Sequence, residues 1–165
     1  MLISESYQHQ NKVLHGSNAK YGTGGHKWAD TVIELSCLHN TRDILDYGCG
    51  KSTLAEALSF PIKQYDPCIP EHSARPQPAD IIVCTDVLEH VEPECIENVL
   101  DDIAGLMKLC GLIFIHTGPA VKTLPDGRNA HLIQKPFSWW KKRLVSRFKI
   151  LSIDELYHGV VVSSL

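Results

Sequence analysis

The residues with the clearest capacity for chemistry lie at the ends of two successive predicted strands. Asp46-Tyr47-Gly48-Cys49-Gly50 follows a short apolar strand and precedes a good helix former, and its glycines allow a sharp turn close to a ligand. Asp66 stands at the end of the next strand, where a carboxylate can accept hydrogen bonds from both hydroxyls of a ribose. Together the turn and the acid predict a nucleoside-containing cofactor on a doubly wound α/β sheet.

The turn also distinguishes between nucleoside cofactors. A dinucleotide-binding loop has the pattern G-x-G-x-x-G, which places a pyrophosphate over the N-terminus of a helix. Here the turn reads G-C-G-K-S from Gly48 to Ser52 and has no third glycine. Asp46 would repel a pyrophosphate, whereas its carboxylate could order an amino group directly or through water. The residues therefore favour S-adenosylmethionine (SAM) over NAD.

Three segments of the chain resemble a known family: ILDYGCGKSTLAEAL, QYDP and ADIIVCTDVLEHVEPE. In residues and in order they are similar to class I SAM-dependent methyltransferases, especially the branch with D-V-L-E-H-V after its fourth strand. The resemblance covers most of residues 40 to 118 and implies a Rossmann-like fold, SAM as cofactor and S-adenosylhomocysteine (SAH) as product. The cofactor-binding residues that it implies are Asp46, Gly48, Cys49 and Gly50 at the methionine part, Asp66 at the ribose, and Thr85, Asp86 and Leu88, with Val87, beside the cofactor.

The chain departs from the family pattern at two places. Ser52 occupies the position of a third glycine, and a loop rich in proline spans residues 67–79, where the family has a helix and a third strand. The end of that strand usually contacts adenine, so the resemblance leaves adenine recognition unexplained. We expect a sheet without one edge strand and a more open adenine pocket with weaker affinity for SAM.

Apolar periodicity and turn residues predict the elements that position this site. The predicted helices cover residues 26–39, 52–58, 93–107 and 136–147, and the predicted strands cover 43–47, 62–65, 80–85, 111–116, 148–153 and 160–163. Such alternation predicts a mostly parallel sheet with helices on both faces. The last two strands are expected to be antiparallel neighbours across Tyr157-His158-Gly159. We expect a single domain over residues 1–165, with a flexible N-terminal lid segment at 1–25 and a substrate loop at 117–135.

Candidate catalytic residues come from the polar loop after the GLIFIH strand. SAM carries an activated methyl group, so the protein mainly positions an acceptor, and a general base is needed only if the acceptor loses a proton. The candidates are His131, Asp126, Arg128 and Asn129, with His116 beside them. His131 is either a general base or a hydrogen-bonded loop residue, and Glu89 and His90 are either structural or catalytic. The residues that could close over the cofactor as a lid are Tyr21, Lys27 and Trp28.

Composition limits the class of protein. The 165 residues carry a net charge of −3, which withdraws the usual electrostatic argument for nucleic-acid binding. Six cysteines form no C-x-x-C pair and there is no H-E-x-x-H, so we expect reduced thiols and no metal site. The N-terminus lacks the pattern of a signal peptide, and no apolar stretch is long enough to span a membrane. These observations predict a cytoplasmic protein, either a monomer or a homodimer.

Three functions are consistent with these residues. The first is methylation of an O, N or C acceptor, most simply on a small molecule. The second is methylation of a nucleic acid, because Trp139-Trp140-Lys141-Lys142-Arg143 could stack on and neutralise a single strand. The alternative interpretation of that segment is an amphipathic helix with one tryptophan in the core. The third function is a non-catalytic SAM-binding module, which the shortened fold would permit.

Overall fold

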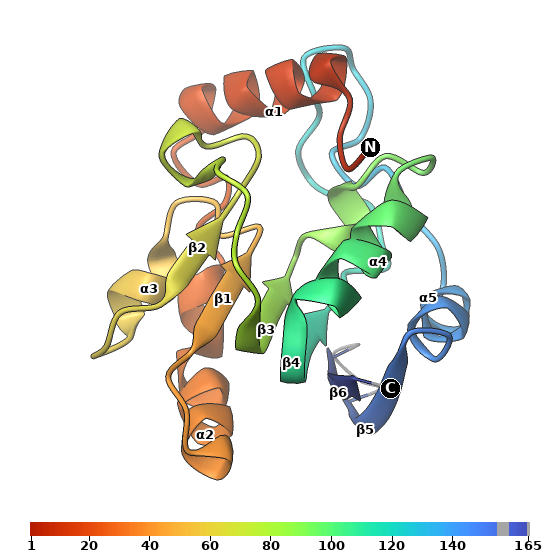
Figure 1. Ribbon diagram of the computed structural model, residues 1–165. Coiled ribbons are helices and arrows are strands. Elements are labelled where there is room, and N and C mark those ends of the chain that lie inside the picture. Colours follow the sequence, from red (N-terminus) through yellow and green to blue (C-terminus); the bar gives the residue numbers. More distant parts are fainter. Residues whose placement is uncertain (155–158, 165) are drawn as a thin grey trace.

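A six-stranded sheet with helices on both faces forms the centre of the computed structural model, which describes residues 1–154 and 159–164 (Figure 1). The strands are β1 (Ile44–Tyr47), β2 (Lys63–Tyr65), β3 (Ala79–Thr85), β4 (Met107–Phe114), β5 (Phe148–Asp154) and β6 (Gly159–Ser164). Their order is β2-β1-β3-β4-β6-β5. The first four strands pair in parallel, whereas β6 is antiparallel to both β4 and β5. This arrangement confirms the predicted α/β fold and its mostly parallel sheet.

Helices cover both faces of the sheet because successive strand residues point to opposite sides. The helices are α1 (Glu5–Ser17), α2 (Ala29–His39), α3 (Thr53–Ala57), α4 (Ile96–Leu106) and α5 (Phe137–Leu144), with 3-10 turns η1 (Gly25–Trp28), η2 (Pro70–His72) and η3 (Leu88–His90). Ile81 packs with α2 and α3, whereas its neighbour Ile82 packs with α4 and α5. Both side chains are fully buried, so β3 is a central strand covered on each face.

Within residues 1–154 and 159–164, the sheet lacks a strand beyond β2, as the proline-rich segment in the sequence predicted. In the described residues β2 is the outermost strand on one side of the sheet and β5 on the other, and the proline-rich segment after β2 contains only η2 before β3 begins at Ala79. Proline lacks an N–H for a ladder hydrogen bond, and Pro76 and Pro78 stand where a further strand would have to form. The predicted absence of the third strand and its helix is therefore confirmed.

The N-terminal segment, expected to be flexible, forms a helix. Ser4 caps α1 by accepting a hydrogen bond from the Tyr7 amide, and the buried residues Tyr7, Asn11 and Leu14 recur at helical spacing. Figure 1 shows α1 lying across the end of the sheet toward which the β2 arrow points, which is the carboxyl end of that strand. The helix could not be predicted from the sequence because most of its residues are polar and only one face is buried.

Two further boundaries differ from the prediction. Helix α4 begins at Ile96 rather than at Pro93, because residues 92–95 first form a turn closed by a 2.8 Å bond from the Cys95 amide to the Glu92 carbonyl. Strand β4 begins at Met107, which was expected to end the helix. The antiparallel β5–β6 pair is confirmed, whereas Tyr157 and His158 of the predicted turn lie outside the described residues. Among the described helices, none has the length and apolar composition needed to cross a bilayer.

Candidate functional site

A cavity of about 620 Å³ opens at the carboxyl ends of β1, β2 and β3. That volume lies in the range of small-molecule and cofactor sites, and ligands of open α/β sheets bind at this edge. Most of the cofactor residues implied by the resemblance line the cavity, namely Asp46, Gly48, Cys49, Gly50, Asp66, Thr85 and Asp86. Leu88 does not, because its side chain is fully buried in the core beneath η3.

At two positions of the glycine turn, the backbone has a conformation that glycine adopts without strain and other residues do not. Gly48 has φ +84°, and a Cβ there would lie 2.4 Å from a methyl carbon of Val87. Gly50 has φ +52°, and a Cβ there would lie 2.7 Å from the Gly22 carbonyl oxygen. The Tyr65 carbonyl accepts hydrogen bonds from the Gly48 amide at 2.7 Å and the Cys49 amide at 3.1 Å. The turn is thereby held against the end of β2.

Two buried carboxyl groups flank the turn. Asp66 is 8% exposed and accepts hydrogen bonds from the Gly50 amide at 3.1 Å and the Cys68 amide at 2.8 Å. Asp46 is 5% exposed, and burial together with the nearby charge of Asp66 raises the pKa of Asp46 to about 7. A cation in the cavity would relieve the cost of ionising Asp46, so the pair is suited to a ligand with a positively charged end.

Residues of the N-terminal segment form one wall of the cavity. The Gly22 carbonyl accepts a hydrogen bond from the Lys51 amide at 2.8 Å, and the Tyr7 hydroxyl donates to the His90 carbonyl. Tyr21 and Lys27, two of the three expected lid residues, line the cavity. The third, Trp28, lies outside the lining and packs against Phe114, with ring centroids 4.7 Å apart.

The loop after β4 contributes two candidate side chains to the cavity, His116 and His131. His131 lines it and is 8% exposed, and burial lowers the pKa of this imidazole. Asp126 and Arg128 form an ion pair of 2.8 Å with each other and lie outside the lining. Asn129 also lies outside, where its side chain accepts from the amides of Ala120 and His131. Asn129 therefore fixes the loop that carries His131.

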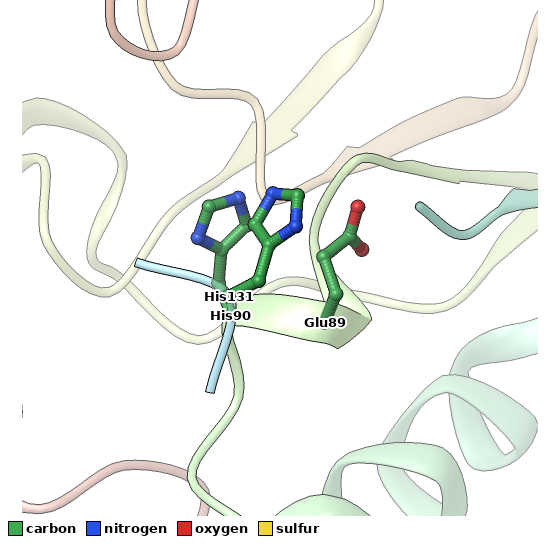
Figure 2. Close-up of side chains that lie close together, drawn as sticks. All are labelled: Glu89, His90 and His131. Carbon is green, nitrogen blue, oxygen red and sulfur yellow. The ribbon is translucent and has the colours of Figure 1, made fainter. Parts of the chain in front are cut away.

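A cluster of three side chains beside the cavity joins this loop to the D-V-L-E-H-V segment. Glu89 and His90 from η3 project to the same side as His131 (Figure 2), and one ligand atom from each lies within 4.8 Å of the others. Burial raises the pKa of Glu89 to about 8 and, with His131 beside it, lowers the pKa of His90 to about 3. All three groups are therefore favoured in their uncharged forms.

The basic segment considered for nucleic-acid binding forms helix α5. Trp140 is fully buried in the core, and the Arg143 guanidinium stacks over Trp139 at 3.4 Å from the ring centroid. Arg143 also pairs with Glu97 at 2.8 Å, and Glu97 pairs in turn with Arg147 at 2.9 Å. Because acidic side chains of α4 neutralise two of the arginines, this geometry favours the amphipathic-helix interpretation.

The strand order, the glycine turn and the cavity at the carboxyl ends of the strands together define a Rossmann-like methyltransferase fold. Residues 19–158 match a methyltransferase domain, and the chain belongs to that family. This membership confirms the resemblance on which the sequence interpretation depended. No curated protein matches the chain at a significant level.

Solved structures with bound ligands share the fold. The magnesium protoporphyrin IX methyltransferase ChlM from Synechocystis PCC 6803 with bound SAH is 16% identical, with a TM-score of 0.53 over 84% of this chain and 82% of that one. The DhpI–SAH complex is 14% identical, with a TM-score of 0.60 over 98% of both chains. The 1,6-didemethyltoxoflavin-N1-methyltransferase of Burkholderia thailandensis, with 1,6-didemethyltoxoflavin and SAH bound, is 12% identical, with a TM-score of 0.59 over 96% of this chain and 88% of that one.

Proposed function

We propose that this chain is a SAM-dependent methyltransferase that acts on an O, N or C atom of a small molecule. The observation that carries the proposal is the cavity itself, in which a tight glycine turn meets two buried carboxyl groups at the end of a parallel sheet. The bound SAH in three structures of the same fold supports the choice of cofactor. The acceptors of those related enzymes, a porphyrin and a toxoflavin precursor by their names, support a small-molecule substrate.

The methionine and ribose parts of SAM have suitable partners in the cavity. The amino group of the methionine part would pair with Asp46, and the backbone of the turn would pack against its chain. The ribose hydroxyls would donate to Asp66, whose two oxygens each retain an acceptor site beyond the amides that they already bind. Helix α1 covers the side left open by the absent strand, because Gln8 donates to the Pro67 carbonyl at 2.6 Å and Asn11 lines the cavity.

The methyl group would face the ends of β3 and β4, where Thr85, Asp86, His116 and His131 line the cavity. Transfer forms a bond between the acceptor atom and the methyl carbon, while the electron pair of the C–S bond returns to sulfur and leaves neutral SAH. The protein contributes alignment of the acceptor behind the methyl group. His131, which lines this part of the cavity, would accept a proton when the acceptor has one to lose.

A direct test combines cofactor titration with an unbiased search for the acceptor. Purified protein would be incubated with methyl-labelled SAM and either a small-molecule extract or total RNA, followed by separation of labelled products by size. We expect label in small molecules. Label found only in RNA would contradict a small-molecule substrate and support a nucleic-acid methyltransferase. Tight SAH binding without any labelled product would favour a non-catalytic SAM-binding module.

The pH dependence of cofactor affinity tests the role given to Asp46. Because the pKa of Asp46 is raised to about 7 in the free protein, it is largely protonated below that pH and must ionise to pair with an ammonium group. SAH affinity should therefore rise by up to about tenfold per pH unit from about pH 5 to 7 and then level off. The Asp46→Asn variant should bind more weakly, without this slope. A wild-type affinity that is flat over this range would contradict the assignment.

A further inference from the structure

We propose that Glu89, His90 and His131 bind a divalent transition-metal ion in the wall of the cavity. Two imidazole nitrogens and one carboxylate oxygen form the ligand set of many zinc and iron sites. The three residues come from two distant segments, η3 and the loop after β4, and Figure 2 shows their side chains projecting to the same side. No spacing in the sequence indicates such a site, because the third ligand lies on a separate loop.

The hydrogen bonds of the two imidazoles prepare them as ligands. Nδ1 of His90 lies 2.8 Å from the Ala130 carbonyl, and Nδ1 of His131 lies 2.7 Å from the Gly118 carbonyl. A carbonyl oxygen only accepts, so Nδ1 carries the hydrogen in both rings and Nε2 keeps a free lone pair. Donation from the second ring nitrogen to a backbone carbonyl is the usual way in which proteins orient a metal-binding histidine.

The carboxylate supplies an independent indication of a missing partner. Glu89 is fully buried, and its Oε1 accepts a hydrogen bond from the His116 amide at 2.9 Å. Its Oε2 is buried and has no partner in the part of the chain that the structure describes. A buried carboxyl oxygen without a hydrogen-bond partner is costly whether or not the group is protonated. A cation bound to Oε2 would remove this cost.

The geometry fits an ion after small adjustments. Tetrahedral ligands at about 2.1 Å from an ion lie about 3.4 Å apart, whereas the ligand atoms here lie within 4.8 Å of one another. Side-chain rotations that move these atoms by about 1 Å would complete the site. Because His90 and His131 line the cavity, the remaining coordination position would face a ligand bound there. If the proposed methyltransferase function holds, an oxygen or nitrogen acceptor could occupy that position. Coordination uses the Nε2 lone pair that His131 would need as a base, so in the metal-bound protein the ion, in place of His131, would promote loss of a proton from the acceptor.

Titration with Co²⁺ tests the site without any enzymatic readout. Metal-free protein, prepared with a chelator and a thiol reductant, would be titrated with CoCl₂ and followed by visible absorption and calorimetry. We expect one ion per chain, with the visible bands of a low-symmetry cobalt site and without the ultraviolet band of thiolate coordination. Zn²⁺ should compete for the same site and remove the visible bands.

Three variants assign the ligands. His131→Ala and Glu89→Gln should each weaken Co²⁺ binding by at least about tenfold, while His9→Ala, at an exposed position of α1 outside the cavity lining, should bind as wild type does. Thermal unfolding of the metal-free variants separates loss of a ligand from loss of the fold. Absent or non-saturable binding, or binding unaffected by His131→Ala, would overturn the metal site. Failure of SAH binding in the same preparation would instead count against the proposed function.

Discussion

Replacement of Gly48 by alanine should destabilise the protein and severely weaken cofactor binding. The residue has φ +84°, which costs an alanine roughly 1–2 kcal/mol, and its Cβ would lie 2.4 Å from a methyl carbon of Val87. Relief of that overlap requires movement of the turn or of Val87, at a further cost of about 1–3 kcal/mol. We therefore expect the free energy of unfolding to fall by about 2–5 kcal/mol. A displaced turn should weaken SAH binding by more than about tenfold.

Denaturant unfolding and SAH titration of the variant check this expectation, with Gly105→Ala as the matched control. A Cβ at Gly105 meets nothing within 4 Å among the described residues, and the position is helical, so this change should be neutral or slightly stabilising. Truncation of Val87 to alanine in the Gly48→Ala background should restore part of the stability. If Gly48→Ala has the same stability and SAH affinity as Gly105→Ala, the turn does not require glycine at position 48.

Replacement of Asp66 by alanine should have the second large effect, a loss of SAH affinity of about 100-fold. The carboxylate accepts from the amides of Gly50 and Cys68 and is assigned to the ribose hydroxyls. Hydrogen bonds to a charged group contribute about 1.5–3 kcal/mol each, so loss of the ribose contacts alone accounts for this change. The two amides would also lose their acceptor, which should lower stability by about 1–3 kcal/mol.

Calorimetric titration with SAH separates the binding effect from the structural one. Asp66→Asn retains one acceptor oxygen and should give an intermediate affinity with near wild-type thermal stability. Asp30→Ala, an exposed acid in the first turn of α2, is the control and should leave SAH affinity unchanged. Wild-type affinity in Asp66→Ala would remove the ribose assignment.

Much of the cofactor half of the site could be predicted from the sequence because its determinants are local. A glycine turn between a strand and a helix, and an acid at the end of the next strand, are set by neighbours in the chain. The parallel topology then brings Gly48 and Asp66 to one edge, since carboxyl ends of parallel strands lie together. Leu88 was the exception, because the start of η3 turns its side chain into the core.

The part of the cavity proposed to hold the acceptor could not be predicted, because it depends on how two distant segments pack. Polarity alone does not distinguish Asp126 and Arg128, which pair with each other at the surface, from His131, which is buried against His90 with ring centroids 4.7 Å apart. The same limit applies to α1, whose mostly polar sequence conceals Tyr7 and Leu14 facing inward. Only tertiary contacts reveal these roles.

Titration of the purified wild-type protein with SAH is the most direct measurement of cofactor binding. The cavity geometry predicts saturable binding of one molecule per chain, accompanied by a rise in thermal stability that grows with ligand concentration. Preparations that show neither heat of binding nor stabilisation, for SAH and for SAM alike, would contradict the function proposed for this cavity.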